Sequence, residues 1–398
     1  MEYVKGMPYF CQTDEKIKSY PYLDADVKCD ILIVGGGIDG AIANYYLSKK
    51  YDVVLVDRAK LGYGCTSCAT ALLEYQLDDF ASDLLKVMSE QEIVMAYQMG
   101  LSAFDKIEDF ISKHGNHCHF LRRPTFLFTN SIFSKKDIEE EYDFRKKHNF
   151  DCFLFTENDN PFPFPIKAGI YCENGGCELN PYLFTRQMID GANNQDRIFE
   201  HTAIVSIKNV RGGIEATTNY GYKIYCKKVL FAGGFNFELF DNKNLCERFI
   251  TYSIVTSPCD YSWKGKALIH DATSPYHYLR TLPDGRIIFG GEDIPFTWQT
   301  PIDEKVANKK YEALEKDFFT LFPDLKDKVK IDYKFCGAFG TTTNNLGLIG
   351  QSEEENILLF ISCGANGIIN AMKGIEIIED ILEGKSNKLE KLFLPTRE

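Results

Sequence analysis

Uninterrupted runs of apolar residues mark the first part of this chain. Residues 31–34 (ILIV) and 53–56 (VVLV) are apolar at every position, which is typical of strands buried on both faces of a sheet. Between these runs, residues 41–47 carry apolar side chains at helical spacing. The order strand, helix, strand predicts a parallel βαβ unit and an α/β fold.

Longer periodic segments follow in the rest of the chain. Apolar spacing of three to four predicts a helix over residues 78–113. Ser134 as a cap predicts a charged helix over 135–148, and Pro181 marks the first turn of a helix to about 192. Further helices are expected over 302–321 and 368–383. Short apolar or alternating runs predict strands at 124–128, 203–210, 228–232, 251–256, 267–270, 276–281, 286–290, 331–340 and 357–362. The turn sequence Leu282-Pro-Asp-Gly285 predicts a hairpin between the strands at 276–281 and 286–290.

Glycines stand where the first strand meets its helix. Gly35, Gly37 and Gly40 have the G-x-G-x-x-G spacing, and Asp57 ends the second strand. The first two glycines allow a tight turn and a close approach to a pyrophosphate, and Gly40 allows the helix to pack close to the strand. Asp57 can accept hydrogen bonds from ribose hydroxyls, which favours an adenosine without a 2′-phosphate. A glycine-rich turn without a ligand would explain the glycines but not the acid, so the pattern predicts a dinucleotide site.

Composition limits the classes of partner. With 398 residues the chain can form two domains, and a formal net charge of −12 argues against binding to nucleic acid. We expect no membrane span, because no apolar run is long enough, and the N-terminal residues lack the apolar segment of a signal peptide. Thirteen cysteines, an odd number, suggest reduced thiols in a cytoplasmic protein rather than a disulfide framework. The sequence does not determine the oligomeric state.

Six segments together resemble one known superfamily over nearly the whole chain. They are GGGIDG at 35–40, GYGCTSCATALL at 62–73, VLFAGG at 229–234, YLRTLPDGRIIFGGED at 278–293, CGAFGTTTNNLGLIG at 336–350 and CGANGI at 363–368. The chain resembles the FAD-dependent D-amino acid oxidase, glycine oxidase and sarcosine oxidase superfamily, especially its γ-glutamylputrescine oxidase-like branch. One departure is Asp39, where the family often has threonine.

The resemblance implies a Rossmann-like FAD-binding domain and a discontinuous substrate domain built on an antiparallel sheet, an α/β (α+β) fold. The FAD-binding domain would comprise residues 1–80, 166–240 and 335–398, and the substrate domain residues 81–165 and 241–334. FAD would lie extended across the first domain. The residues expected to contact FAD are Gly35, Gly37, Ile38, Gly40, Asp57, Arg58, Thr66, Ser67, Ala71, Leu72, Leu73, Val205, Ala232, Gly233, Gly364, Asn366, Gly367 and Ile368.

The resemblance also implies an activity. The enzyme would oxidise the CH–NH bond of an amine or amino acid by hydride transfer to flavin N5, with oxygen or another carrier as the electron acceptor. Tyr278 and Arg280 are the expected catalytic-site pair, because alternation along a strand puts both on one face. An arginine fork can bind a carboxylate through two hydrogen bonds. The alternative for Arg280 is a salt bridge at the surface of the hairpin.

Cysteine motifs suggest rival functions. Cys172 and Cys177 match the C-x-N-x-G-C pair of flavin-dependent disulfide reductases, but they lie far beyond Asp57, where the resemblance predicts a turn away from the flavin. A reductase should also have a second G-x-G-x-x-G, and residues 100–330 contain none. A protein that binds FAD without turnover is the third alternative.

Other groups of candidate ligands are weaker. We interpret Cys65 and Cys68 as small residues tolerated near the cofactor, and Cys336 lies one position from the cysteine that attaches the flavin in sarcosine oxidases. His114, His117, Cys118 and His119 have no second ligand set with zinc spacing, so no metal is expected.

Overall fold

A mostly parallel sheet forms one half of the molecule. The computed structural model describes residues 3–13, 16–235, 246–273, 275–297 and 302–393. The strand order is β17-β18-β11-β2-β3-β8, formed by Leu348–Gln351, Ile357–Ile361, Lys223–Phe231, Val27–Val34, Val53–Val56 and Ile198–Phe199. All neighbours pair in parallel except the edge strand β17. The hairpin of β9 (Ile204–Val210) and β10 (Gly213–Thr218) extends from β11.

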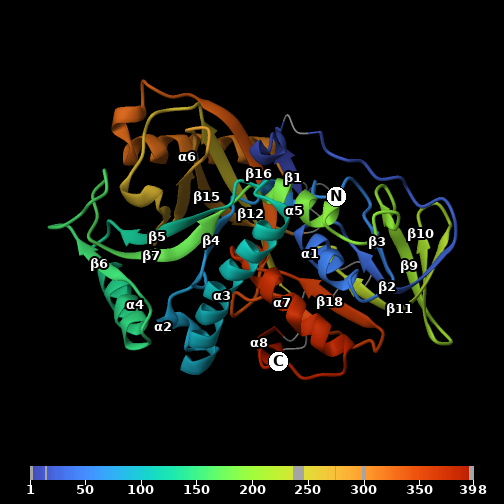
Figure 1. Ribbon diagram of the computed structural model, residues 1–398. Helices are drawn as coiled ribbons and strands as arrows, with labels where there is room; N and C mark the ends of the chain where they lie inside the picture. Colours follow the sequence, from blue (N-terminus) through green and yellow to red (C-terminus); the bar gives the residue numbers. More distant parts are fainter. Residues whose placement is uncertain (1–2, 14–15, 236–245, 274, 298–301, 394–398) are drawn as a thin grey trace.

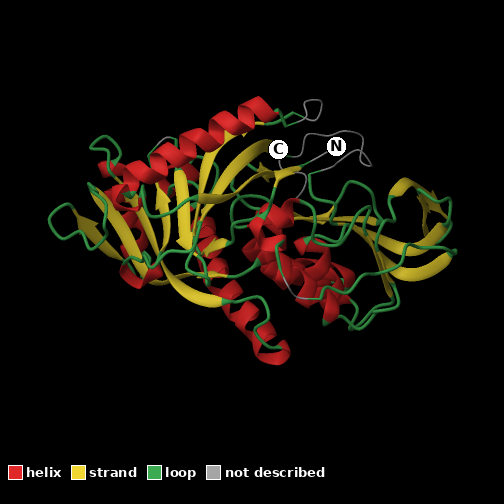
Figure 2. Cartoon of the chain, turned by 90° about the horizontal axis from the view of Figure 1, so that it is seen from above, coloured by secondary structure: helices red, strands yellow, loops and turns green. Residues whose placement is uncertain are grey.

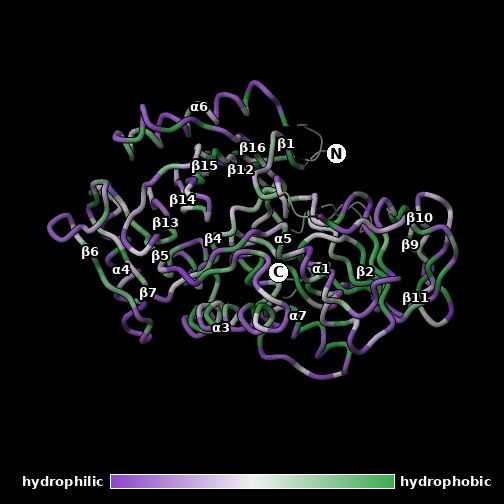
Figure 3. Tube along the Cα trace, turned by 45° about the horizontal axis from the view of Figure 1, so that its top comes forward, coloured by the Kyte–Doolittle hydropathy of each residue, from purple (hydrophilic) through white to green (hydrophobic). Residues whose placement is uncertain are grey.

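Helices form a layer on one side of this sheet. They are α1 (Ile38–Leu47), α5 (Pro181–Asp190), α7 (Gly367–Leu382) and α3 (Glu90–His114), and they pack side by side in the order α5, α1, α7, α3. In this layer, α1 and α7 contact the strands of the sheet. Figure 1 shows α1 and α7 beside the strands of the parallel sheet. Strands β3 and β18 are apolar at every position, as are the last residues of β2 and β11, and Figure 3 shows hydrophobic colouring around β2 and β11. Burial on both faces therefore explains the unbroken apolar runs in the sequence.

A second sheet of ten strands forms the other half. Its order is β1-β16-β12-β15-β14-β13-β5-β7-β4, with β6 (Phe153–Thr156) paired to β7. The strands are Val4–Gly6, Ile331–Thr341, Glu247–Thr256, Ile287–Pro295, His277–Thr281, Leu268–Asp271, Leu121–Thr129, Ala168–Glu178 and Leu72–Glu74. Pairing is antiparallel except between β5 and β13.

The second sheet has its own aromatic core. The long helix α6 (Glu304–Leu321) lies along β12, β15 and β16, and Figure 2 shows it above the sheet. Phe126 stacks on Phe162 with ring centroids 3.8 Å apart, and Phe289 packs edge-on against Phe318 of α6 at 5.7 Å. The shorter helices α2 (Ala81–Leu84), α4 (Lys135–Lys147) and α8 (Glu390–Phe393) complete the described elements. Some of the many phenylalanines of the sequence thus form this core.

The Rossmann-like parallel sheet and the antiparallel sheet confirm the predicted fold class. However, the residues at which the chain passes from one sheet to the other differ from the predicted domain boundaries. Strand β7 begins at Ala168, just after the predicted boundary at 166, yet it belongs to the antiparallel sheet. Strand β16 crosses the predicted boundary at 335, and β1 and β4 also join this sheet from the N-terminal segment. Of these strands only β16 was predicted, and its pairing partners could not be read from the apolar pattern.

Two further expectations were wrong in detail, and the strand β10 was missed. The helix predicted over 78–113 is divided into α2 and α3, and a capping box at Ser89 starts the second of them. Cys172 and Cys177 lie inside strand β7, not on a turn. Strand β10 was not predicted, although Gly212 and Gly213 at the hairpin turn mark its start. Within the described residues, no helix combines the length and apolarity needed to cross a membrane.

Candidate active site

A cavity of about 780 Å³ lies at the carboxyl ends of the parallel strands. Ligands bind at this edge in open α/β sheets, because loops and helix N-termini meet there. Fifteen of the eighteen residues expected to contact FAD line it. They are Gly35, Gly37, Ile38, Asp57, Arg58, Thr66, Ser67, Ala71, Leu72, Leu73, Ala232, Gly233, Gly364, Gly367 and Ile368. We call this space the cofactor cavity.

The glycine turn leaves room that a side chain would fill. Gly35 has φ +111°, and a Cβ there would lie 2.4 Å from the carbonyl oxygen of Ala232. Gly37 lines the cofactor cavity, so its missing side chain keeps the backbone accessible to a ligand. Gly40 does not line the cavity, and its Cβ would lie 1.8 Å from the carbonyl oxygen of Gly35. Its role is the close contact between α1 and the turn after β2, as the sequence predicts.

Asp57 is held in place by backbone groups. Its two carboxylate oxygens accept hydrogen bonds from the amides of Gly36 and Ala59, each at 2.7 Å. Burial raises the pKa of Asp57, and these amides act in the opposite direction. The carboxylate lines the cofactor cavity beside Arg58. This arrangement fits the ribose contact predicted from the motif.

Two helix N-termini meet at the cofactor cavity. Gly37 and Ile38 bring in the start of α1, and Gly367 and Ile368 bring in the start of α7. The hydroxyl of Thr66 accepts a hydrogen bond from the Ile38 amide at 3.0 Å, which ties the 62–73 loop to α1. Exposed amides and the dipoles of two helices favour negative charge. The donors, the glycine turn and the acid together fit the phosphates and ribose of FAD.

Asp39 is a buried acid in this otherwise anion-binding site. It lies in the first turn of α1, and its carboxylate accepts hydrogen bonds from the amide and hydroxyl of Ser362. Burial raises the pKa of Asp39 to about 7, although both hydrogen bonds lower it. The sequence marks this residue only as a departure from the family. Its burial could not be inferred from a position next to a glycine motif.

Arg280 does not occupy the position predicted for it. Its side chain is 1 % exposed and lines neither of the two cavities described here. The guanidinium donates to the carbonyls of Thr70 (2.9 Å) and Leu179 (2.8 Å) and lies 3.3 Å from the Glu178 carboxylate. The predicted carboxylate-binding role is therefore corrected, because protein groups already engage the guanidinium. The alternation along the strand predicted that Arg280 shares a face with Tyr278. It could not show that protein groups already surround the guanidinium.

The Arg280 contact supports a strained turn in the cofactor cavity. Ala71, which follows the Thr70 carbonyl, has φ +52°, a left-handed conformation that is uncommon for alanine. Ala71 and its neighbour Leu72 both line the cofactor cavity. Arg280 thus acts through the backbone of residue 70 as a positioning residue for this turn.

Two other expected cofactor contacts lie elsewhere. Val205 is 56 % exposed on β9 and does not line the cofactor cavity. The side chain of Asn366 donates to the carbonyl of Gln76 at 2.7 Å and accepts from the amide of Glu74 at 3.1 Å. It therefore fixes the end of β4 at the start of α7 rather than facing the cofactor cavity.

A larger cavity of about 1370 Å³ adjoins the first one. It is formed between the ends of the two sheets, and we call it the substrate-side cavity. Five residues line both spaces, namely Leu72, His270, Tyr276, Phe339 and Ala365. We call these five residues the junction. A molecule in the larger cavity would meet the cofactor there.

Polar side chains at the junction are paired. The Tyr276 hydroxyl donates to Asp293 at 2.6 Å, and His270 Nδ1 lies 3.0 Å from Glu74. Burial lowers the pKa of His270, but the Glu74 carboxylate outweighs this effect, so the net pKa is raised. Tyr278 lines the cofactor cavity nearby, 2.8 Å from the Thr251 hydroxyl. Burial keeps the pKa of Tyr278 well above its usual value, so the phenol stays protonated.

Cys172 and Cys177 lie away from both cavities. Neither lines the cofactor cavity or the substrate-side cavity. The Cys172 sulfur contacts the Tyr75 hydroxyl and the Arg145 guanidinium at 3.6 and 3.7 Å. A hydrogen bond from Cys152 lowers the pKa of Cys172 to about 6. This thiol is therefore acidic but has no path to a flavin, which removes the structural basis of the disulfide reductase alternative.

The cysteines nearer the cofactor cavity are poor nucleophiles. Cys65 and Cys68 line the cavity, and burial raises the pKa of Cys65 to about 12. A thiol exchanges only as the thiolate, so Cys65 is unreactive at neutral pH. Cys336 lies in the core beneath α6 with Tyr311, away from the cavity wall formed by the following residue, Gly337.

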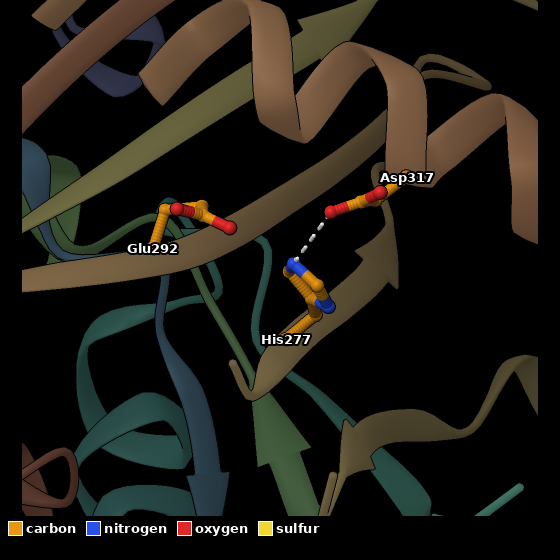
Figure 4. Close-up of side chains that lie close together, drawn as sticks. All are labelled: His277, Glu292 and Asp317. Atoms are coloured by element: carbon orange, nitrogen blue, oxygen red, sulfur yellow. Dashed lines mark ion pairs between the residues drawn. The ribbon is translucent and has the colours of Figure 1, made fainter. Parts of the chain in front are cut away.

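Among the described residues, one group of three could hold a metal ion. The ligand atoms of His277, Glu292 and Asp317 all lie within 4.8 Å of one another (Figure 4). His277 Nε2 is 3.6 Å from Asp317, and Glu292 is already paired with Lys310 at 2.7 Å. None of the three lines either cavity. The lysine makes this group an ion-pair network between the second sheet and α6.

Comparisons with known proteins agree with this geometry. Glycine oxidase of Bacillus licheniformis is 23% identical over 91% of this chain and 95% of its own length. Gamma-glutamylputrescine oxidoreductase of Escherichia coli is 20% identical over 96% of this chain and 90% of its own. The crystal structure of glycine oxidase from Geobacillus kaustophilus superposes with a TM-score of 0.80 and 16% identity, covering 93% of this chain and 99% of that one. The model of the DAO family, FAD dependent oxidoreductase, matches residues 30–377, and the chain therefore belongs to this family of FAD-dependent enzymes.

Proposed function

We propose that the enzyme oxidises the carbon–nitrogen bond of a small amine or amino acid. The observation that carries the proposal is the junction, where the substrate-side cavity opens onto the cofactor cavity. Relatives named as glycine oxidase and gamma-glutamylputrescine oxidoreductase support the substrate class. A meeting point of two cavities is what an enzyme needs to present a substrate carbon to a cofactor.

The chemistry follows from the cofactor. When bound, FAD accepts a hydride from the carbon next to the substrate nitrogen. The nitrogen must also lose a proton, which leaves an imine that water hydrolyses to a carbonyl compound and either ammonia or an amine. Oxygen or another acceptor would take up the two electrons.

The contribution of the chain is to bind and orient. Tyr276 and His270 form the polar part of the junction, and Phe339 and Leu72 form the apolar part. Both polar residues are held by carboxylates, so their positions are fixed before a substrate arrives. Tyr278 would support the cofactor side as a neutral phenol. A rigid surround of this kind lowers the entropic cost of aligning the reacting carbon.

The test is reduction of the bound flavin without oxygen. A panel of amines and amino acids is mixed anaerobically with the yellow holoenzyme, and loss of the visible flavin absorbance is followed. At least one compound should bleach the flavin at a rate that depends on its concentration. A fully reducible flavin (by dithionite) that no amine or amino acid bleaches would contradict the proposal.

The electron acceptor is determined in the same preparation. After bleaching, the enzyme is mixed either with oxygen or with an artificial quinone, and the return of absorbance is timed. Rapid recovery with oxygen identifies an oxidase, whereas recovery only with the quinone identifies a dehydrogenase.

A further inference from the structure

His270 presents one ring nitrogen to the space where the two cavities meet. Its ring lines both cavities, and its side chain is 22 % exposed. Nδ1 lies 3.0 Å from the Glu74 carboxylate. Nε2 makes no hydrogen bond within the described residues, yet it is not one of their buried polar atoms that lack a partner. Because protein neither engages nor seals Nε2, a molecule at the junction can reach this atom.

Glu74 determines which ring nitrogen carries the lone pair. An ionised carboxylate only accepts hydrogen bonds, so Nδ1 is the protonated nitrogen and the lone pair lies on Nε2 of the neutral ring. The Glu74 side chain is buried and also accepts from the Gln76 amide. Its backbone amide donates to Asn366 at the start of α7. The acid is thus fixed by the same helix that reaches the cofactor cavity.

The neighbouring strands hold the imidazole between the two sides of the site. His270 pairs with Tyr278 of β14 on one side and with Leu127 of β5 on the other. The Tyr278 ring lies 6.0 Å from the imidazole and lines the cofactor cavity, whereas Leu127 lines the substrate-side cavity. This is the position that a group in contact with the reacting nitrogen of a substrate would need.

The other polar groups at this position are poor proton acceptors. Burial holds the pKa of both Tyr276 and Tyr278 well above its usual value, so the two phenols keep their protons. Asp293 accepts from the Tyr276 hydroxyl at 2.6 Å. Its other oxygen, Oδ1, is buried without a partner in the described part of the chain, where a substrate cannot reach it. None of these groups offers a substrate an accessible basic lone pair.

The acids around His270 strengthen it as a base. Burial lowers the pKa of His270, but the charges of Glu74 and Asp78 outweigh this effect and raise the net value. Asp78 itself accepts from the Ala365 amide at 2.9 Å, and burial raises its pKa to about 6. Further acids, such as Asp271 on the same strand, line the substrate-side cavity. A proton taken up by the imidazole is therefore stabilised by nearby negative charge.

We propose that Nε2 of His270 takes a proton from the substrate nitrogen, and that Glu74 positions the ring for this step. The inference rests on the proposed amine oxidation and adds a catalytic residue to it. An amine that arrives as an ammonium ion has no lone pair to assist the loss of hydride. Transfer of one N–H proton to Nε2 leaves a neutral amine and an imidazolium paired with Glu74. The nitrogen lone pair then forms the C=N bond while the hydride leaves the carbon, with its two electrons, for the cofactor. The imidazolium finally returns its proton to water.

The first test is the pH dependence of flavin reduction in His270→Ala and His270→Asn. Glycine, sarcosine, benzylamine and putrescine are mixed anaerobically with the holoenzymes, and the fastest of them is followed from about pH 6 to pH 10. At pH 7 both variants should be slower by roughly 10²- to 10⁴-fold. The second-order rate constant of the wild type should level off above the pKa of His270. That of the variants should keep rising up to the pKa of the amine, about 10 for an alkylamine. A merely structural role would lower the constant by one factor at every pH.

The second test is rescue by free imidazole. His270→Ala leaves a space at the junction that imidazole can fill, so added imidazole should speed flavin reduction at pH 7 by at least roughly 10-fold. His270→Asn, which fills part of the space, should respond less. The control is His117→Ala, which changes an exposed histidine outside both cavities and should behave like the wild type with and without imidazole.

The role of Glu74 is tested through the pKa of the ring. Proton NMR gives this pKa in the holoenzyme, and the resonance is assigned by its absence from His270→Asn. The wild-type value should coincide with the pH at which flavin reduction levels off. In Glu74→Gln both should move to lower pH together, because the carboxylate no longer stabilises the imidazolium. A ring that titrates independently of flavin reduction would contradict the inference.

The outcomes separate this inference from the proposed function. If no amine or amino acid bleaches the wild-type flavin, the proposed function fails and this inference with it. Amine oxidation stands and the inference fails in either of two cases. In the first, the His270 variants match the wild type at pH 7. In the second, they lose the same factor at every pH and imidazole does not rescue them. FAD content and melting temperature are measured for each variant, and His270→Asn keeps a donor for Glu74 should His270→Ala be unstable.

Discussion

At the scale of single residues, the sequence predicted the backbone of the cofactor site better than its side chains. Gly35, Gly37 and Asp57 have roles that follow from local geometry, and all three lie where the motif predicts. Arg280 and Asn366 depend on which distant carbonyls reach them, which no local pattern contains. The alternation that paired Tyr278 with Arg280 also includes Tyr276, so that signal could have found the junction tyrosine.

Asp39 gives a prediction about pH. Its pKa is about 7 in the folded chain against 3.8 ordinarily, so the folded state binds a proton that the unfolded state has lost between these values. Stability contributed by this group is therefore present below pH 3.8 and lost as pH rises to 7. Asp39→Asn keeps acceptor and donor atoms for Ser362 without the charge. At pH 8 the variant should be more stable than wild type by about 1–4 kcal/mol.

The measurement is the difference in melting temperature between variant and wild-type holoenzymes from pH 4 to pH 8. The difference should grow as pH rises and level off above pH 7. Because all other groups are shared, they cancel in this comparison. A difference that does not change with pH would show that Asp39 ionises normally.

Arg280 gives a prediction about stability in place of the catalytic role first expected. Arg280→Ala leaves the buried Glu178 with Arg123 alone and frees the Thr70 carbonyl, so it should destabilise the protein by about 3–5 kcal/mol. FAD content should fall as well, because the Ala71 turn loses its support. Chemical denaturation and the ratio of flavin to protein absorbance measure the two effects.

The matched control is Arg122→Ala on strand β5. Arg122 is half-exposed and paired with Asp105 and Glu108, so its loss should cost about 1 kcal/mol or less. Unchanged stability and flavin content in Arg280→Ala, with a large rise in KM, would instead restore the substrate-binding role.

At the scale of elements, helix α3 contains a position where tertiary packing outweighs the helix propensity of the residue. Gly100 is in the middle of this helix, where alanine is ordinarily better by about 1 kcal/mol. A Cβ at Gly100 would lie 2.4 Å from the carbonyl oxygen of Tyr75 and 2.7 Å from its Cα. Backbone cannot yield as a side chain can, so Gly100→Ala should destabilise by about 1–3 kcal/mol despite the better propensity.

The companion variant is Gly374→Ala in α7. There the Cβ would meet only side-chain atoms of Ile349, the nearest being its terminal Cδ1 at 2.2 Å, and a side chain can shift more easily than backbone. Thermal unfolding of both variants should show a clear loss for Gly100→Ala and a smaller change for Gly374→Ala. Equal changes would mean that the contact with residue 75 relaxes freely.

The existence of most elements was predictable, because hydrophobic period is a local property. The strand at 251–256 and the helix at 302–321 correspond to β12 and α6 within a few residues at their ends. The division of the helix predicted over 78–113 was not predictable, since Ser89 acts as a cap only in the context of its own hydrogen bonds. The assignment of β7 to the antiparallel sheet depended on long-range pairing with β5, which periodicity does not encode.

At the scale of the whole molecule, the two cavities depend on segments from every part of the sequence. The junction combines Leu72, His270, Tyr276, Phe339 and Ala365. The resemblance could place the cofactor cavity, because its motifs at 35–40, 229–234 and 363–368 lie at the carboxyl ends of parallel strands. It could not give the charge of the substrate-side cavity, which results from acids brought together from strands of the antiparallel sheet and from helices α2 and α4.

The pairing of the first strand with one near the end has a consequence for biosynthesis. Val4 in β1 lies opposite Gly337 in β16, and the central strand β11 gains its neighbour β18 only with residues 357–361. The ribosome therefore has to release almost the entire chain before either sheet can close. Until then, strands rich in aromatic residues, such as β5, belong to an incomplete sheet. Unpaired strand edges favour aggregation. The yield of folded protein in a recombinant host should depend on how long these strands stay unpaired. Lower growth temperatures and added chaperones should therefore raise it.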